Sequence, residues 1–532
     1  MKHLCLFVCC LLLPITSMGQ KTTIYLDHSD KLEFNNEIWP DCQILTGNVQ
    51  FRHEDMLMSC DSAYFYDKRN EIIATGNIKM NQRDSLFVYG DKLFYDGNIR
   101  LARLRHNVRM ENNQAILYTD SLNYDRKRNI GYYFNGGKIV DNANELVSVK
   151  GRYYPNTDLA IFQKNIVLTN PDFVLTSDTL HYNTRTDIAT ILGPSDIVYQ
   201  DSTFIYGENG WYDTEKDIAF LTRNANIHDL EGHFLSADTL YHNHRAHHTE
   251  AFTAVSLSDT LQDIQIKGNY GWYNDLHQEA LITKLPTLYY IQHTASSSDT
   301  LYITADTMQY ADNTQQYIKS YHNVQSWHTD FQSIADSAFY NSLDSTLYLY
   351  GTPIMWNDSN QHTGNEIHLK LVNNTIERVF LEGHAFVFSK TDSMVVNQMS
   401  GKQIIGYFNN KRMYKTEVIC NARSLYFVED TPATEQEEAT YSGINQCESS
   451  QLIMYTNDNN SIKKVIMSPA SNGTLHTPDK INQQKVTRLE GFHDYHNLRP
   501  RSKEDIYIPK NKETLKADNA AIKVRKRRRS NN

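Results

Sequence analysis

The stretch Asp120-Ser121-Leu122-Asn123-Tyr124-Asp125 decides the fold, because the chain returns to this phrase eleven times between Asp61 and Gly401. The copies begin at Asp61, Asp91, Asp120, Gly151, Asp178, Glu208, Asp238, Asn269, Asp306, Asp336 and Asn365. The steps between them are 30, 29, 31, 27, 30, 30, 31, 37, 30 and 29 residues. A fixed period of this size indicates stacked repeats, in which each unit buries its apolar face against its neighbours. The function should then belong to a continuous surface or groove.

Alternation within the phrase predicts β-strands. Asp120, Leu122 and Tyr124 are expected on one face of a strand, and Ser121, Asn123 and Asp125 on the other. A second strand signal between the copies opens with Gly or Asn, residues that suit turns with positive φ. Charged stretches such as 67–70 and 125–129 predict hairpin turns. With no sustained 3.6-residue period in the repeats, the sequence predicts an all-β protein, an elongated, repeat-built antiparallel jellyroll with a period of about 30 residues.

The chain divides into four parts by composition. Residues 1–19 have the basic start, short apolar stretch and small residues of a secretory signal peptide, which predicts export to the periplasm. Residues 20–415 hold the repeats, and residues 416–468 form a weakly repeat-like β segment. Residues 469–532 are polar and basic and are expected to be a flexible tail.

Four cysteines, Cys42, Cys60, Cys420 and Cys447, remain after the signal peptide. They could form the disulfides Cys42–Cys60 and Cys420–Cys447 or stay as four isolated thiols. The formal net charge is −10, whereas the chain ends in a basic run at residues 523–529. That run is either a solvated tail or a contact for an anionic surface. An exported, acidic protein is not expected to bind nucleic acid.

No catalytic constellation is evident in the sequence. One carboxylate recurs at the same place in each repeat, which marks the fold and does not single out a catalytic pair, so an enzyme is not expected. The histidines of residues 242–248 lie where other repeats have a turn, which favours an exposed turn over a metal site, and no cofactor is indicated. The Asp-Ser/Thr triplets resemble an O-glycosylation acceptor pattern, although capping of a strand entry explains the same residues.

An inner apolar ladder is the remaining candidate for a binding site. Its predicted members are Val49, Ile78, Leu93, Tyr95, Val108, Leu122, Tyr124, Ile139, Val167, Leu180, Tyr182, Leu240, Met308 and Tyr310. They would either interdigitate as a dry core or line an open trough for acyl chains. Periodicity does not separate these two arrangements.

The signal peptide, the Gly-Asn-Val strands and the Asp-Ser/Thr-Leu-x-Tyr-Asp strands together resemble the OstA-like family over roughly residues 22–400. This family includes the lipopolysaccharide transport protein LptA and the N-terminal domain of LptD, and the chain looks closest to its long Bacteroidetes members. The resemblance implies an open, V-shaped jellyroll that holds the acyl chains of lipid A in its groove. It also implies LptC-like inner-membrane and LptD-like outer-membrane jellyroll partners that stack edge to edge, and self-association by the same edges. The C-terminal residues, about 130 in number, have no counterpart in the family pattern.

These features predict a periplasmic bridge that binds lipopolysaccharide, passes it from the inner to the outer membrane and changes no covalent bond. The first rival is a structural or adhesive cell-surface β-solenoid with a filled core. The second is a glycan-binding β-protein, which would need an aromatic platform outside the repeat register. Only Trp39, Trp327 and Trp356 qualify for such a platform.

Overall fold

The computed structural model is built from antiparallel β-strands with four short 3₁₀ helices, which confirms the predicted fold class. It describes residues 22–35, 37, 39–112, 115–200, 202–293, 298–372, 375–390, 395–409, 412–429, 441–457, 462–477 and 488–510. The expected signal peptide and the basic run at 523–529 lie outside these residues. In the described part, no helix has the length and apolar character that crossing a bilayer requires.

The chain forms two units that we describe separately. Unit 1 comprises the described residues up to 200 together with Glu208–Glu215, and unit 2 comprises Ser202–Gly207 and the described residues from Lys216 onward. The strands of unit 1 are β1 (Tyr25–His28), β2 (Lys31–Phe34), β3 (Gln43–His53), β4 (Met56–Tyr66), β5 (Glu71–Gln82), β6 (Leu86–Asp96), β7 (Leu101–Glu111), β8 (Ala115–Asp125), β9 (Ile130–Tyr133), β10 (Gly137–Asp141), β11 (Asn144–Ser148), β12 (Lys150–Tyr154), β13 (Leu159–Thr169), β14 (Phe173–Asn183), β15 (Ile188–Ile191), β16 (Ser195–Tyr199) and β18 (Asn209–Asp213).

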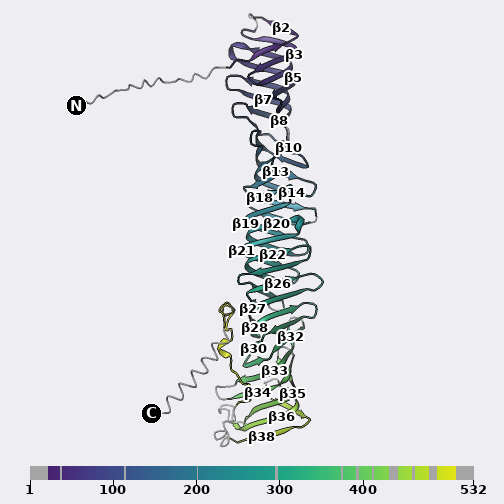
Figure 1. The fold of residues 1–532 in the computed structure, drawn as a ribbon, viewed down its shortest axis with the longest axis vertical. Helices are drawn as coiled ribbons and strands as arrows, with labels where there is room; N and C mark the ends of the chain where they lie inside the picture. The colour runs from purple at the N-terminus through teal and green to yellow at the C-terminus, as the bar shows by residue number, and fades with distance from the viewer. Residues whose placement is uncertain are drawn as a thin grey trace, which may run out of the picture. The chain divides into compact units, whose positions relative to one another are not determined.

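Unit 2 continues the same pattern of paired strands, which lie rung beside rung in Figure 1. Its strands are β17 (Phe204–Gly207), β19 (Ile218–His228), β20 (His233–Asn243), β21 (His248–Asp259), β22 (Ile264–Asn274), β23 (Glu279–Thr283), β24 (Thr287–His293), β25 (Ser298–Thr304), β26 (Thr307–Ala311), β27 (Tyr317–Trp327), β28 (Gln332–Asn341), β29 (Thr346–Tyr350), β30 (Ile354–Asn357), β31 (Asn360–Thr363), β32 (Glu366–Val372), β33 (Thr375–Lys390), β34 (Val396–Asn409), β35 (Arg412–Glu429), β36 (Tyr441–Thr456), β37 (Ile462–Ser468) and β38 (Asn472–His476). The 3₁₀ helices are η1 (Asp67–Arg69), η2 (His244–Ala246), η3 (His496–Leu498) and η4 (Asp505–Tyr507).

The long strands bend at their middle, where one or two residues leave the ladder. In β5, the pairing with β6 breaks between Thr75 and Ile78. The two residues in between, Gly76 and Asn77, have φ values of 79° and 43°, which Gly and Asn tolerate better than other residues. The side chain of Asn77 donates a hydrogen bond of 2.8 Å to Asp61, the first residue of a repeat phrase. The repeated Asp is therefore a corner residue that ties two neighbouring bends together.

The same corner bond recurs in both units. It joins Asn48 to Asp30, Asn107 to Asp91 and Asn323 to Asp306 at 2.8, 2.6 and 2.8 Å. The Asp of the repeat therefore has a structural role, because its carboxylate accepts a hydrogen bond from the neighbouring bend.

The bends divide each unit into two walls. In unit 1, wall A holds the strand halves 43–46, 62–66, 71–75, 92–96, 101–105 and 121–125, and wall B holds 49–53, 56–60, 78–82, 86–89, 108–111 and 115–119, with later strands continuing both. Side chains from the two walls meet between them, as the rings of Phe51 and Phe65 do with centroids 5.4 Å apart. The side away from the bends, where the hairpin turns lie, is called the mouth.

Hairpin turns form where the sequence predicted them. Residues 67–70 form η1 and end on Asn70 in the left-handed region, and residues 126–129 connect β8 to β9. In the histidine-rich stretch, η2 begins at His244 and His247 takes the left-handed conformation, so a turn forms here as well.

Two expectations need correction. All four cysteines are free, with Cys420 exposed and the other three buried, so neither proposed disulfide is formed. The flexible tail expected from residue 469 does not hold for β38 or for residues 488–510, which pack on unit 2. We call residues 488–510 the strap.

The strap lies along the outer face of wall B in unit 2, where Figure 1 shows it in yellow beside β27 to β33. Leu489 and Leu498 are each 7% exposed and pack in clusters with the wall residues Phe388 and Trp356. Buried glutamines of wall B form hydrogen bonds with the backbone of the strap. The amide of Leu489 donates to Gln398, the amide of Tyr495 donates to Gln361, and Gln325 donates to the carbonyl of Ile508. Sequence composition missed this because the strap's apolar residues are spaced too widely to form a periodic signal.

Candidate functional site

The space between the walls is the candidate site, and in most repeats side chains fill it. Thirteen of the fourteen predicted ladder residues are at most 2% exposed, including Leu122 and Tyr124 at 0%. The exception is Val167, which is 36% exposed and points outward. Lys164 and Asn165 both have positive φ and form the bend of β13, so the inner positions after it are Ile166 and Leu168. The prediction for Val167 was therefore wrong by one residue in register.

Two residues assigned to the outside are less exposed than the alternation suggested. Ser121 and Asn123 are 5% and 9% exposed; Arg105 pairs with Ser121 across the two strands, and its guanidinium donates to Asn123 at 3.1 Å. Asp120, placed with Leu122 on the inner face, is exposed, since the bend falls between them. Strict alternation fails where a strand turns from one wall to the other.

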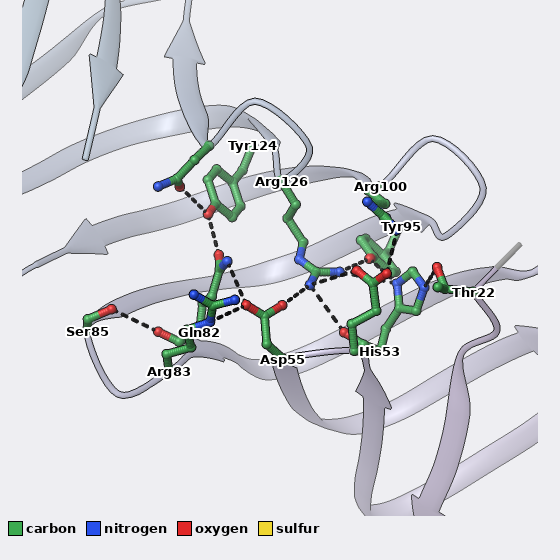
Figure 2. A network of polar contacts seen from close by, with 12 residues as sticks. Thr22, His53, Asp55, Gln82, Arg83, Ser85, Tyr95, Arg100, Tyr124 and Arg126 are labelled. Atoms are coloured by element: carbon green, nitrogen blue, oxygen red, sulfur yellow. Dashed lines mark hydrogen bonds and ion pairs between the residues drawn. The ribbon is translucent and has the colours of Figure 1, made fainter. Parts of the chain in front are cut away.

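A polar network crosses the mouth of unit 1 (Figure 2). Arg126 follows the wall A strand β8, and its side chain is only 2% exposed. It donates to the Asp55 carboxylate of wall B at 2.8 Å and to the Tyr95 hydroxyl at 2.5 Å. His53 of wall B lies 2.5 Å from the same hydroxyl, and burial together with the Arg126 charge lowers its pKa. A neutral His53 can accept from the tyrosine, which joins the two walls without burying a second cation.

Other repeats use the ladder tyrosines in the same way. The Tyr124 hydroxyl donates to Gln82 of wall B at 2.6 Å. The Tyr182 hydroxyl lies 3.3 Å from the Asp141 carboxylate and accepts from Asn144 at 3.1 Å. In unit 2, the Tyr310 hydroxyl donates to Asp259 at 2.6 Å. The tyrosine of the repeat phrase thus places its hydroxyl at the mouth and its apolar ring in the core.

The surroundings of Asp141 disfavour the ionised form of its carboxylate. It is 2% exposed, and one of its carboxylate oxygens has no hydrogen-bond partner among the described residues. Burial and the neighbouring charge of Asp187 raise the pKa of Asp141 to about 6. This carboxylate therefore titrates near neutral pH, close to one of the ties between the walls.

The walls separate toward the C-terminal end of unit 2 and enclose a cavity of about 620 Å³. Its lining includes Met399, Tyr426 and Cys447 of wall B and Leu452, Met454 and Met467 of wall A. Met399, Met454 and Met467 are half-buried, whereas the ladder residues of unit 1 other than Val167 are fully buried. Flexible methionine side chains adapt to irregular apolar surfaces. Polar side chains such as Asn397, Ser424 and Asn445 share the lining, so it suits an amphipathic ligand that has both an apolar chain and polar groups.

A comparison with protein-family models matches residues 21–178 to the OstA-like protein family. Residues 21–178 are OstA-like. Among solved structures, the chain is similar to LptH of Pseudomonas aeruginosa, described as the LptA-homologous periplasmic component of a lipopolysaccharide transport device. The identity is 18%, the match covers 26% of this chain and 95% of the other, and the TM-score is 0.18. No curated protein matches the chain.

The OstA-like region contains Arg126 and Tyr124, whose side chains join the two walls at the mouth of unit 1. It ends just before Tyr182, which makes a similar contact. The large cavity lies far beyond it in sequence, between residues 357 and 471. None of the fourteen predicted site residues lines that cavity. The loss of the Asp-x-Leu-x-Tyr phrase after residue 401 and the methionines at 399, 413, 454 and 467 were the available signals.

Proposed function

We propose that this protein is a periplasmic bridge that shields the acyl chains of lipopolysaccharide between its walls and passes the lipid from the inner toward the outer membrane. The observation that carries the proposal is the cavity between the walls at Leu452, Met454 and Met467. The OstA-like region at residues 21–178 supports the lipid class. Each methylene moved from water into apolar surroundings is stabilised by about 0.8 kcal/mol, so many methylenes must be buried together to outweigh the entropy lost on binding.

The terminal strands are the docking sites that this function needs. In unit 1, β2 pairs with β3 alone among the described strands, and its residues Leu32 and Phe34 are 50% and 58% exposed. In unit 2, β38 pairs with β36 and leaves Leu475 57% exposed. Unpaired strand edges recruit further strands. LptC-like and LptD-like jellyrolls, or a second copy of this chain, are the partners that such edges fit.

A structural role is the second candidate, and the filled interior of unit 1 favours it. Ladder residues at most 2% exposed, with an arginine and tyrosines tied across the mouth, are what a β-solenoid with a dry core requires. In a bridge, the same residues would form a rigid scaffold that opens only near the cavity. The two functions differ in whether lipid reaches the inner face.

Photo-crosslinking in cells with labelled lipopolysaccharide tests the choice. A photoreactive residue at Met467 faces the cavity, and one at the adjacent Ile466, which is 37% exposed and does not line it, is the matched control. We expect lipid adducts at Met467 and Met454 and none at Ile466. A further probe at Leu122 asks whether the tied part also opens to lipid. Absence of adducts at both methionines, with the protein folded and exported, would refute the lipid-binding proposal and leave the structural role.

A further inference from the structure

A second kind of tie crosses the mouth of unit 2, and it places a histidine among carboxylates, with no Lys or Arg of the described residues paired to them. His233, the first residue of β20 in wall B, is 3% exposed. Its Nδ1 lies 2.9 Å from an Asp229 carboxylate oxygen, and its Nε2 lies 3.2 Å from an Asp312 carboxylate oxygen beyond the end of wall A strand β26. A neutral imidazole has one N–H, so one of these contacts would place a lone pair against a carboxylate. Either a second proton on the ring or a metal ion between the two groups removes this conflict; burial opposes the proton, whereas the carboxylates of Asp229, Asp259 and Asp312 raise the pKa of His233.

The Asp229 side chain determines which imidazole nitrogen is free. Its other oxygen accepts from the amides of Glu231 and His233 at 2.9 and 3.1 Å, which fixes the carboxylate in place. A hydrogen bond from Nδ1 to Asp229 then leaves the Nε2 lone pair facing Asp312 and Asp259. Histidines that bind metals are oriented by a carboxylate in this manner.

The spacing of the donor atoms fits a metal ion. His233, Asp259 and Asp312 each offer one ligand atom, and these three atoms lie within 4.8 Å of one another. The 3.2 Å between Nε2 and the Asp312 oxygen is close to the ~3.4 Å edge of a tetrahedron with bonds of about 2.0–2.1 Å. The three residues come from two hairpin turns of wall B and one of wall A.

Charge and an unpaired hydroxyl point to the same place. Asp229, Glu231, Asp259 and Asp312 converge here, and no Lys or Arg of the described chain is seen in an ion pair with any of them. The Tyr273 hydroxyl is buried and has no hydrogen-bond partner among the described residues, and its ring lies 5.9 Å from that of His233. The carboxylates at this site also act electrostatically on Tyr273. A metal-bound water would give this hydroxyl a partner.

The position of Asp312 in its repeat corresponds to that of Arg126 in unit 1. Arg126 follows Tyr124 by two residues, as Asp312 follows Tyr310 by two residues, and both lie at the wall A side of the mouth. In unit 1 the side chain itself supplies the positive charge that meets wall B. In unit 2 a carboxylate occupies that place and faces other carboxylates.

We propose that His233, Asp259 and Asp312 bind a divalent transition-metal ion, with Zn²⁺ the best fit, and that the ion ties wall A to wall B at the mouth of unit 2. One imidazole and two carboxylates suit Zn²⁺, whereas Ca²⁺ and Mg²⁺ prefer oxygen ligands alone. Asp229 is the positioning residue for His233. The sequence predicted no metal site, because the ligands are separated by 26 and 53 residues and form no spacing motif.

Equilibrium dialysis of the metal-stripped full chain against Zn²⁺, read by elemental analysis, tests the site. We expect one Zn²⁺ per chain and a thermal midpoint that rises with Zn²⁺ but not with Mg²⁺. Asp312→Asn keeps the shape and hydrogen bonds of the turn and should weaken binding at least tenfold, as should His233→Gln. His228→Gln, which removes an exposed histidine from the same hairpin, is the matched control and should bind normally.

Two results would overturn the proposal. One is a folded wild-type chain that binds no Zn²⁺. The other is full binding by Asp312→Asn and His233→Gln, which would move the ion to the histidines of residues 242–248. Circular dichroism of Asp312→Asn keeps the test valid if His233→Gln fails to fold.

Discussion

The guanidinium of Arg126 lies 2.8 Å from the carboxylate of Asp55, a residue 71 positions away in the chain, and this contact joins wall A to wall B. The tie closes the mouth of the jellyroll above the ladder residues Tyr95 and Tyr124. The Arg126 side chain is 2% exposed, so it has lost most of its contact with water. Contacts with Asp55, with Tyr95 and with both the ring and the carbonyl of His53 offset this cost.

Replacing Arg126 with Met should lower the free energy of unfolding of unit 1 by about 3 kcal/mol, because it leaves the Tyr95 hydroxyl and Asp55 without their shared donor. Urea denaturation measures the loss. The control is Arg128→Met in the same turn, whose side chain is 77% exposed and which should change stability by less than about 0.5 kcal/mol. Equal effects of the two changes would show that the buried tie contributes nothing special.

Asp141→Asn should stabilise the protein at pH 7. Because the pKa of Asp141 is raised to about 6, its stabilising contribution is complete below the unfolded value near 4 and is lost as the pH rises through 6. The neutral amide avoids that loss, so we expect a gain of roughly 1–3 kcal/mol at pH 7 and little change at pH 4. The exposed Asp196→Asn is the control, expected to be neutral at both pH values. A gain that is the same at pH 4 and pH 7 would contradict the electrostatic explanation.

Unit 2 should lose stability as the pH falls below about 6.5. Burial lowers the pKa of His242 to about 3 and that of His362 to about 4. Their unfolded forms bind a proton near pH 6.5 while the folded forms stay neutral, so stability is present above that pH and declines toward pH 4. Each histidine should cost about 1.4 kcal/mol per pH unit in this window. Urea midpoints at pH 7.5, 6 and 5 measure the slope, which His362→Gln should reduce, and a slope unchanged by that substitution would refute the assignment.

Gly76→Ala should destabilise unit 1 by about 1–3 kcal/mol. The corner glycine has a φ of 79°, and an added Cβ would lie 2.4 Å from the Asp61 carboxylate that accepts from Asn77. Gly193→Ala is the matched control, since no atom lies within 4 Å of its added Cβ and its φ is outside the left-handed region. Thermal unfolding of both variants gives the comparison, and a stable Gly76→Ala chain would show that the corner adapts.

Gln361→Leu should release the strap. The Gln361 side chain is 1% exposed, donates to the carbonyl of His493 at 2.8 Å and accepts from the amide of Tyr495 at 2.8 Å. Its loss leaves a buried amide unsatisfied, which costs about 1–3 kcal/mol. Limited trypsin digestion should then cut after Arg501 and Lys503 several times faster than in the wild type. Gln315→Leu, at an exposed turn, should leave the rate unchanged.

The sequence predicted the elements of the fold more closely than the site. The 30-residue period and the alternation of Leu122 with Tyr124 identified an antiparallel β repeat, and both residues are buried as expected. Alternation failed where it was carried across a bend. At Val167 the left-handed residues Lys164 and Asn165 shift the register by one, and Asp120 is the single residue of β8 that leaves the ladder. The Gly-Asn signal predicts a turn, and in the structure it also resets the register of the strand.

What the sequence by itself determined is the local structure: strands from alternation, corners from Asp, Gly and Asn, and hairpin turns from charged stretches. These follow from steric and hydrogen-bonding preferences that act over a few residues. Only the tertiary structure decided which repeats are tied shut and where the walls part. The pairing of Arg126 with Asp55, the convergence of His233, Asp259 and Asp312, and the cavity at Met454 and Met467 all join residues from different strands. Such contacts depend on how the walls face each other, and no local preference along the chain encodes that distance.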